Sequence, residues 1–396
     1  MYKILTFLPF PTPKLILERL SLPILLIHIP LDHSHPVPVR LGLEEKEGVW
    51  DERRQFKTQL FAVTGSQWSA LSSTRLLCLG AQTSLDRLHH LTELLTNWSG
   101  PVSISVFTPD IELGLTVTYI QYLQSCLPAM ARVSFHLTVP ADRPGLQDPA
   151  LEVGEGWDCQ QPRLVLERIL QRRGEDMMSW RESYPYPQNL LRNTAKRGCQ
   201  TNYTFIPDID MVPTPGMDLH LETFLQKDQE TNNCTKCAFV IPTYEISSKS
   251  EHLPRTKEEL LTFIKEKEAR QFHLGLLNQM ASNLRRWERI PESRDLEVAY
   301  KVEKYIFMYE PVYVARADTP DFDERFIGFG MTRTTQLYEM YVAGYKFFLL
   351  NNVFTSHWGF LSLSSRPQWR YKQQWANNLK FKGFAEEVRE NVIESD

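Results

Sequence analysis

Two aspartates separated by one residue, Asp208 and Asp210, end an apolar segment that reads FIPDIDMVP over residues 205–213. Aspartate is a poor strand former and is costly to bury without a partner. Side chains two apart on an extended segment point the same way, so the two carboxylates could share one cation. A second pair with this spacing, Asp321 and Asp323, occurs in the same chain. The pattern alone is therefore equally compatible with an ordinary turn.

The elements that precede the first pair alternate in type. Apolar runs with strand character occupy 75–81, 102–107 and 133–139, and helical spacing occupies 85–98 and 112–127. This alternation predicts a parallel sheet with right-handed crossovers.

A helix and a strand lead directly to the pair. The segment PQNLLRNTAKRG (187–198) predicts a helix that Gly198 ends, and NYTFIP (202–207) predicts a strand. Asp208 and Asp210 then lie at that strand's carboxyl end, where open α/β sheets bind ligands. This placement favours a ligand site over a chance turn.

The second half of the chain is more mixed. Strands are predicted over 237–246, 310–316 and 346–354, an amphipathic surface helix over 256–273, and a helix over 335–344 that ends near Gly344. The segments typical of P-loop, serine-hydrolase and zincin sites are absent from the sequence.

Composition places the chain among ordinary globular proteins, with 396 residues, 42% hydrophobic and 23% charged. A net charge of −4 gives no basic footprint, so nucleic acid is not an expected partner. The apolar segments 4–13 and 20–31 are each about half as long as a membrane-spanning helix needs, and prolines interrupt both. An atypical signal region or an irregular leader is the expectation there, and a clear membrane anchor is not visible.

Six cysteines are too few and too scattered for a small disulfide scaffold. Cys234 and Cys237 form one C-x-x-C without the further ligands that zinc needs, so we expect structural or unpaired thiols. Glycosylation sequons begin at Asn97, Asn202 and Asn233, which hints at a secretory route. Asn202 is the predicted glycan carrier, since it precedes the strand that delivers Asp208.

Six motifs in order carry a family resemblance: YPQNLLRNTAKRG, DIDMVP, FVIPTYEI, YEPVYVAR, FDERFIGFG and FTSHWGF. Over about 71–362 the chain resembles glycosyltransferase family 49, which holds glucuronyltransferases of the dystroglycan glycosylation pathway. The resemblance implies an α/β GT-A fold, a Rossmann-like mixed sheet with helices on both faces. It also implies inverting transfer of glucuronic acid from UDP-glucuronic acid onto a xylose-terminated glycan, as in dystroglycan O-mannosyl glycan synthesis, in the Golgi lumen.

This implied domain covers 71–384, with a nucleotide-sugar half (71–210) and an acceptor half (211–384). Residues 1–70 are then an irregular leader and stem, and 385–396 are a tail. Three features depart from the family. The first seventy residues and the type II membrane anchor do not match, Pro207 replaces an aliphatic residue, and Trp358 replaces a basic one. Proline cannot donate to a sheet ladder, but at the last residue of a strand the loss is tolerable.

The resemblance also implies the site. A UDP leaving group needs its charge neutralised by a divalent cation, and Asp208, Asp210 and His357 are the expected ligands. A nitrogen ligand beside carboxylates favours Mn²⁺, with Mg²⁺ as the alternative. The acceptor hydroxyl needs a base, for which Asp323 and Glu324 are the candidates, unless they form a solvated surface turn.

Further side chains are candidates for binding the two substrates. For the donor, the expected contacts come from Asn189, Arg192, Arg325 and Arg333, because arginine binds carboxylates in a bidentate manner. Trp358 and Gly359 are the acceptor candidates. Trp369, Tyr371 and Trp375 could stack on sugars but in such a segment would more often close the core.

Two other functions stay open at this point. One is an N-acetyllactosaminide N-acetylglucosaminyltransferase on the same fold, and the other is a catalytically silent sugar-binding protein. A two-carboxylate glycosidase would need facing acids and no metal. Association with other Golgi glycosyltransferases is a further expectation from the family.

Overall fold

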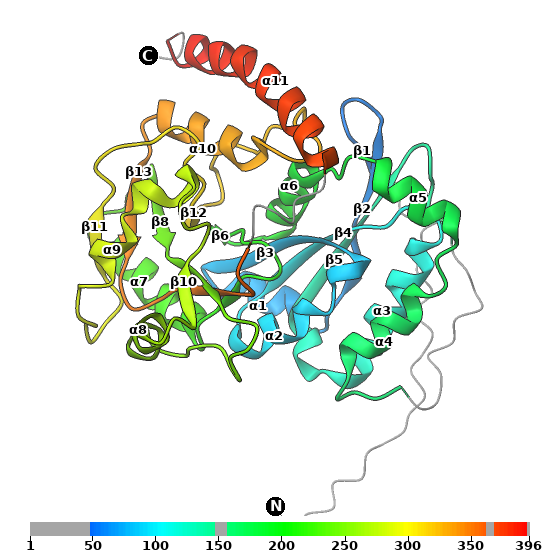
Figure 1. The fold of residues 1–396 in the computed structure, drawn as a ribbon, viewed down its shortest axis with the longest axis horizontal. Helices are drawn as coiled ribbons and strands as arrows, with labels where there is room; N and C mark the ends of the chain where they lie inside the picture. Colours follow the sequence, from blue (N-terminus) through cyan, green and yellow to red (C-terminus); the bar gives the residue numbers. More distant parts are fainter. Residues whose placement is uncertain (1–47, 147–156, 362–367, 394–396) are drawn as a thin grey trace, which may run out of the picture. The chain divides into compact units, whose positions relative to one another are not determined.

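In the computed structural model, a large mixed sheet and a smaller sheet organise the described residues, which are 48–146, 157–361 and 368–393 (Figure 1). All of them belong to one unit, Arg40–Asp396. The large sheet has the strand order β1-β2-β5-β4-β3-β6-β12-β8-β13-β11, and the small one has the order β10-β9-β14-β7.

The strands are β1 (Val49–Trp50), β2 (Phe56–Thr64), β3 (Leu77–Ser84), β4 (Val102–Phe107), β5 (Val133–Pro140), β6 (Tyr203–Phe205), β7 (Val212–Pro213), β8 (Cys237–Ile241), β9 (Thr243–Ile246), β10 (Ala269–Gln271), β11 (Val298–Lys301), β12 (Val312–Arg316), β13 (Lys346–Leu350) and β14 (Thr355–Trp358). The α-helices are α1 (Trp68–Thr74), α2 (His90–Asn97), α3 (Glu112–Cys126), α4 (Pro162–Leu170), α5 (Glu175–Ser183), α6 (Gln188–Gly198), α7 (Met217–Thr231), α8 (Lys257–Lys265), α9 (Leu284–Trp287), α10 (Thr332–Val342) and α11 (Gln368–Ile393). Short 3₁₀ helices are η1 (Leu85–Arg87), η2 (Pro128–Arg132) and η3 (Leu277–Ser282).

The centre of the large sheet is parallel, as the sequence predicts. β3 pairs with β4, β4 pairs with β5, and β6 pairs with β3, all in parallel. Starting at β3, the chain adds β4 and β5 on one side and then returns through α6 to add β6 on the other side. The strand order therefore reverses between β3 and β6, and open α/β sheets bind ligands at the carboxyl ends of the strands beside such a reversal.

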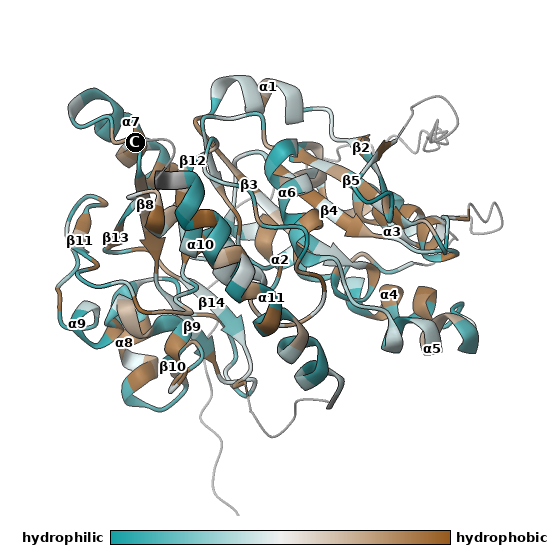
Figure 2. Ribbon diagram, turned by 90° about the horizontal axis from the view of Figure 1, so that it is seen from above, coloured by the Kyte–Doolittle hydropathy of each residue, from teal (hydrophilic) through white to brown (hydrophobic). Residues whose placement is uncertain are grey.

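Hydrophobic residues concentrate in the strands of the large sheet, as Figure 2 shows for β4 and β8. Every residue of β4 is buried, and so are the polar residues Ser134, His136 and Thr138 of β5. Both faces of these strands are thus covered, which is why continuous apolar runs rather than strict alternation mark them.

The assignment of 1–70 to an irregular leader is wrong for its last part. β2 pairs antiparallel with β5, and it buries Phe56 and Val63 in the domain. The pairing shifts register between Gln59 and Val63, and Phe61 there has a φ of 53°. This irregularity interrupts the period-two pattern by which a strand is recognised in sequence.

Two predicted elements of the second half are each split in the structure. The strand predicted over 237–246 breaks at Pro242 into β8 and β9, which lie in different sheets. The helix predicted over 256–273 ends at Lys265, and the chain continues as β10, paired with β9. Lys267, with a φ of 64°, makes the turn between α8 and β10. The local sequence pattern does not show that residues 269–271 leave the helix and pair with β9.

α10 and α11 pack against each other at the C-terminal end of the described chain (Figure 1). Phe381 and Phe384 of α11 cluster with Tyr338 of α10. α11 continues without a break through residue 385, where the predicted tail begins. The expectation that the aromatic segment closes the core is wrong for Trp369, Tyr371 and Trp375, which are 43%, 59% and 66% exposed.

α6 ends at Gly198 as predicted, but glycine is needed there for packing and not as a C-terminal cap. Gly198 does not adopt the left-handed conformation of a C-terminal glycine cap. A Cβ atom at this position would collide with Nε2 of His136 and Oγ of Ser103, on β5 and β4. Gly198 therefore allows α6 to approach the sheet closely, and α6 carries Asn189 and Arg192.

All six cysteines are paired, which confirms a structural role and makes the unpaired alternative wrong. The disulfides are Cys78–Cys199, Cys126–Cys159 and Cys234–Cys237. The first ties β3 to the residue after α6, so it fixes this helix against the strand at the point of strand-order reversal.

Of the helices in the described ranges, none is both long enough and apolar enough to cross a membrane. The apolar segments 4–13 and 20–31, on which the leader prediction rests, lie outside the described residues.

Candidate active site

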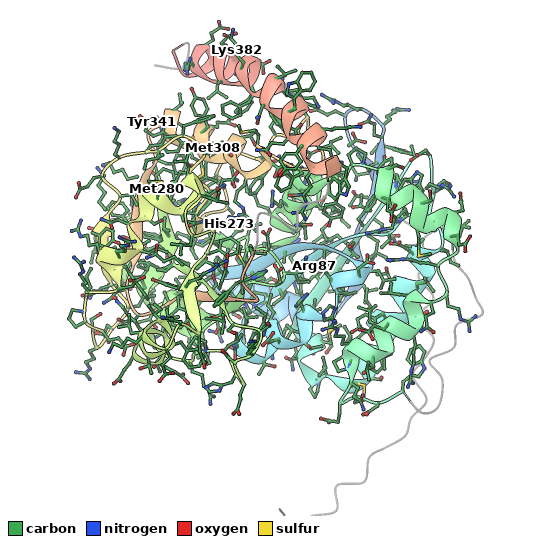
Figure 3. All side chains as sticks on the ribbon, viewed as in Figure 1. Arg87, His273, Met280, Met308, Tyr341 and Lys382 are labelled. Carbon is green, nitrogen blue, oxygen red and sulfur yellow. A yellow bond between two sulfur atoms is a disulfide. The ribbon has the colours of Figure 1, made fainter. Side chains whose placement is uncertain are left out.

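A cavity of about 730 Å³ lies where the strand order reverses. β3 contributes Gln82–Ser84 to its lining, and the segment after β6 contributes Asp208–Met211. β12 runs antiparallel to β6, so the start of β12, with Glu310 just before it, reaches the same edge of the sheet. The remaining lining includes residues from both halves of the chain, among them Arg87, His273 and Met308 (Figure 3). Asp208 and Asp210, which the sequence predicts to form a ligand site, line this cavity.

The cavity is rich in arginine. Five arginines and three carboxylates belong to its lining; they are Arg87, Arg181, Arg192, Arg333, Arg370, Asp208, Asp210 and Glu310. Guanidinium groups bind phosphates and carboxylates through paired hydrogen bonds. Arg181 is paired with Asp86 and Glu112, which do not line the cavity, whereas Arg192 and Arg333 share the single carboxylate of Asp208 and so suit a ligand that brings negative charge.

Asp208 is held by two arginines from different helices. Nη2 of Arg192, on α6, lies 3.2 Å from Oδ1, and Nη2 of Arg333, on α10, lies 3.1 Å from the same oxygen. Burial opposes ionisation of Asp208, but the two guanidinium groups outweigh it and hold its pKa well below the usual range. Asp208 is therefore ionised at all physiological pH values.

The two arginines are themselves nearly inaccessible, with side chains 5% and 8% exposed. Burial lowers the pKa of Arg192, and the charge of Arg333 lowers it further, although Asp208 acts in the opposite direction. Two buried like charges thus share one carboxylate oxygen. An additional anion would relieve their repulsion.

Asp210 is paired with a histidine from the small sheet. β7, which follows Asp210, pairs with β14 so that Ser356 lies opposite Val212. This register brings Nε2 of His357 to 3.1 Å from Oδ2 of Asp210, and Arg87 forms a salt bridge to the same oxygen. Despite the opposing effect of burial, the pair favours its charged forms, with the pKa of Asp210 lowered and that of His357 raised.

The chemistry of this set fits a divalent cation that a substrate helps to coordinate. Asp210 and His357 are in contact, and Asp208 is close enough to act on the pKa of Asp210. Both arginines bind Oδ1 of Asp208, so the second oxygen of that carboxylate lies outside these salt bridges. In the described residues, no three His, Cys, Asp or Glu side chains are grouped as a complete metal site. Mg²⁺ and Mn²⁺ sites of this kind need only one or two carboxylates, because phosphate oxygens and water complete the shell.

Glu310 is a cavity residue that the sequence analysis missed as a site candidate. Its carboxylate accepts hydrogen bonds from Nδ2 of Asn278 at 2.7 Å and from Oγ1 of Thr334 at 2.5 Å. The available signal was its position in EPVYVAR, immediately before a strand that borders the Asp strand. Arg87 and Arg181 were missed as well, and no local pattern marks either of them.

The structure does not bring the predicted bases to this cavity. Asp323 and Glu324 line a separate pocket of about 590 Å³. There Asp323 pairs with Arg325, and Glu324 accepts from Nδ2 of Asn193 at 2.8 Å. Arg325, a donor candidate, also belongs to this pocket and not to the arginine-rich cavity.

Asn189 does not line the cavity, but it supports a residue that does. Its Nδ2 donates to the carbonyl oxygens of Asp323 and Thr332, and its Oδ1 accepts from Nη1 of Arg192 at 3.2 Å. The side chain is buried and all of its polar atoms are used. Asn189 therefore orients Arg192.

Comparison with known proteins gives the family. A family model described as "Glycosyl-transferase for dystroglycan" (glycosyltransferase family 49) matches residues 76–392. The chain is also 35% identical to human beta-1,4-glucuronyltransferase 1 over 319 residues, which is 78% of this chain and 74% of that protein. The chain belongs to glycosyltransferase family 49.

Two more distant similarities accompany this family match. Human xylosyl- and glucuronyltransferase LARGE1 is 26% identical over 80% of this chain but only 36% of its own length. Among solved structures, S. aureus TarS in complex with UDP-GlcNAc has a TM-score of 0.33 and 8% identity, over 80% of this chain and 71% of that chain. The last similarity is too low to support any conclusion.

Residues of the family 49 motifs contribute to two different pockets. Asp208, Asp210, Arg192, Arg333 and His357 meet in one cavity, whereas FDERF borders another pocket. Pro207 follows the end of β6, so its missing N–H costs no ladder hydrogen bond.

Trp358 and Gly359, the two acceptor-binding candidates, directly follow His357. Nε1 of Trp358 donates to both carboxylate oxygens of Glu93 on α2, at 2.9 and 3.1 Å. Gly359 has a φ of 83°, and its N–H donates to the carbonyl of Ile246. Neither residue belongs to the cavity lining, and Trp358 is engaged by α2.

The three sequons differ in their surroundings. Asn202 is exposed at the amino end of β6, whereas Asp208 follows the carboxyl end of this strand. Asn97 is partly buried, and its Nδ2 donates to the carbonyl of Pro213 at 2.9 Å. Asn233 is exposed, next to the Cys234–Cys237 disulfide.

Proposed function

We propose that this chain is an inverting glucuronyltransferase of the GT-A type, which transfers glucuronic acid from UDP-glucuronic acid to a xylose-terminated glycan. The observation that carries the proposal is the arrangement of Arg192 and Arg333 on one oxygen of Asp208, in the cavity at the strand-order reversal. It supplies a desolvated cationic surface beside carboxylates, which suits a nucleoside diphosphate.

In this proposal each charged group of the site has a task. Arg192 and Arg333 bind donor oxygens and hold Asp208 in the ionised form. Asp208 and Asp210, with His357, hold Mn²⁺ or Mg²⁺. When bound, the cation would act as a Lewis acid that neutralises charge on the departing diphosphate. Asn189 keeps the Arg192 guanidinium in place for this task.

The donor sugar is assigned from the family and the arginines together. Relatives of this chain carry glucuronyltransferase in their names, and glucuronic acid adds a carboxylate to the negative charge of UDP. Arg87, which is half-exposed and paired with Asp210, lines the same cavity as Arg192 and Arg333 and is the candidate partner for that extra anion, whereas Arg181 is already paired with Asp86 and Glu112.

The site is expected to face an oxidising compartment. Three disulfides join all six cysteines, and such bonds persist in the secretory pathway rather than in the cytosol. We therefore place the domain in the Golgi lumen, with a glycan or glycoprotein as acceptor and other Golgi glycosyltransferases as neighbours.

A competition between UDP-glucuronic acid, UDP-xylose and UDP-N-acetylglucosamine tests the proposal, with Mn²⁺ and with a chelator. We expect UDP release from UDP-glucuronic acid in the presence of an acceptor, and loss of release in the chelator. Preference for UDP-N-acetylglucosamine would make the lactosamine enzyme the better account. A chain that binds glycans but releases no UDP would be a catalytically silent sugar-binding protein.

A further inference from the structure

Inverting transfer to a hydroxyl requires a base that can take the hydroxyl proton, and the cavity offers three carboxylates for this task. Asp208 is neutralised by two arginines, and Asp210 is paired with Arg87 and His357. Contact with cations lowers the proton affinity of a carboxylate. The two aspartates are therefore poor bases.

The third carboxylate, that of Glu310, has a different environment. Each of its oxygens accepts a hydrogen bond from a neutral group, the amide of Asn278 and the hydroxyl of Thr334. A carboxylate has about four lone-pair positions, so these bonds leave room for a third donor. Neutral hydrogen bonds orient Glu310 without cancelling its charge.

Glu310 lines the same cavity as both aspartates. β12 runs antiparallel to β6, with Val314 opposite Phe205, so the segment before β12 and the segment after β6 lie at the same edge of the sheet. Glu310 lies in the first of these segments, and the two aspartates lie in the second.

The first turn of α10 joins these carboxylates on the other side. Arg333 binds Asp208, and the next residue, Thr334, binds Glu310. The charge of Glu310 also acts on Arg192, the second arginine at Asp208. The shared cavity, the first turn of α10 and the interaction with Arg192 thus place Glu310 near the arginine pair.

We propose that Glu310 is the catalytic base of the transfer, an inference that rests on the proposed function. The acceptor hydroxyl oxygen forms a bond to the anomeric carbon of the donor sugar as the bond from that carbon to the phosphate oxygen breaks. The electron pair of the broken bond leaves with UDP. The hydroxyl proton passes to the Glu310 carboxylate and then to water, which restores the base.

The test compares Glu310→Gln and Glu310→Asp with a control, Glu303→Gln. Glu303 lies between β11 and β12, as Glu310 does, and its side chain is 83% exposed. A positioned base contributes about 10²–10⁴-fold, so we expect kcat of Glu310→Gln to fall by at least about 100-fold. Its affinity for UDP should stay within about threefold of that of the unmodified chain. Glu310→Asp keeps a carboxylate and should retain more activity than Glu310→Gln, whereas the control should match the unmodified chain.

A purely structural role of Glu310 predicts the opposite order. Glutamine keeps the length of the side chain and one acceptor oxygen, so it would then be milder than aspartate, and thermal stability and UDP affinity would fall together with kcat. That pattern, or normal transfer by Glu310→Gln, would overturn the proposal. So would loss of transfer in Glu324→Gln with Glu310→Gln active, since the base would then be Glu324.

A second measurement keeps the inference testable if substitution at 310 reduces stability. An acceptor whose attacking hydroxyl is made more acidic by a neighbouring fluorine needs less help from a base. It should restore part of the lost kcat in Glu310→Gln, and no such restoration would contradict the proposal. If the unmodified chain transfers no sugar at all, the proposed function fails and Glu310 has no transfer to catalyse; if it transfers and Glu310→Gln does too, only this inference fails.

Discussion

Arg192 and Arg333 meet at one atom, Oδ1 of Asp208, at 3.2 and 3.1 Å. They come from α6 and α10, which are far apart in sequence, and both side chains are buried. Bringing two buried cations together is costly unless anions compensate them. Asp208 supplies one negative charge, and the proposed donor supplies more.

Replacing Arg333 with lysine should therefore weaken UDP binding. Arg333→Lys keeps the positive charge but loses the planar fork, which also donates to the carbonyl of Ile206. A charge-assisted hydrogen bond contributes about 1.5–3 kcal/mol, so the Kd for UDP should rise by about 10-fold to 100-fold. Titration calorimetry measures this directly.

Arg316→Lys is the matched control for that measurement. Arg316 is partly exposed at the end of β12, and its nearest acidic partner, Asp318, is 3.6 Å away. Its substitution should leave the Kd for UDP unchanged. Equal affinities of the two variants would contradict an anion-binding role of Arg333.

Much of the parallel half was predictable because each strand and helix there has its own periodic signal. The Asp208–Asp210 segment was found since it ends a predicted strand. The pairing of His357 with Asp210 followed from the family alone, and the structure supplies its physical basis in the β7–β14 register. Glu310 was not found because its significance depends on which strand β12 borders.

For some residues, the sequence did not predict the structural surroundings correctly. Asp321 and Asp323 repeat the spacing of Asp208 and Asp210, but they lie with Glu324 against a different pocket. Gly198 was correctly identified as a helix end, yet glycine is needed there because His136 and Ser103 approach closely across the sheet. Such contacts between distant segments leave no periodic signal in the sequence.

Gly198→Ala should destabilise the fold. The new methyl group would meet His136 and Ser103, and overpacking of this kind costs about 1–3 kcal/mol. Gly383→Ala on α11 provides the control, because nothing lies within 4 Å of a Cβ atom there. In a helix interior that change should stabilise by about 0.5–1 kcal/mol. Urea unfolding of both variants would show opposite signs, and a stable Gly198→Ala would refute the packing account.

His136 should make stability sensitive to acid. Nδ1 accepts from the N–H of Phe61 at 2.9 Å, so the other ring nitrogen carries the proton and faces Oγ of Ser103 at 3.0 Å. Burial lowers the pKa of His136 from 6.5 to about 3. The folded state therefore binds fewer protons than the unfolded state between these values.

The contribution of His136 to stability is complete above about pH 6.5 and decreases as the pH falls toward 3, by at most about 1.4 kcal/mol per pH unit. His136→Gln removes the titrating ring. Its unfolding free energy should depend less steeply on pH over this range than that of the unmodified chain. Parallel curves for the two proteins would show that His136 is not the group responsible.

Asn202 should carry a glycan and Asn97 should not. Asn202 is exposed, whereas the Asn97 amide that would be modified donates to Pro213. After expression in secretory cells, glycosidase digestion should shift the band, and Asn202→Gln should remove part of that shift. Asn97→Gln should leave the shift unchanged, and the reverse result would contradict the assignment.

The most direct measurement of the central claim is analysis of the product formed from UDP-glucuronic acid, Mn²⁺ and a xylose-terminated acceptor. The account predicts that the acceptor gains one glucuronic acid in the inverted configuration. It also predicts that Asp210→Asn, although folded, forms almost none, because a ligand for the cation is lost. An acceptor that stays unmodified with the unmodified chain, or normal product formation by Asp210→Asn in a chelator, would contradict the account.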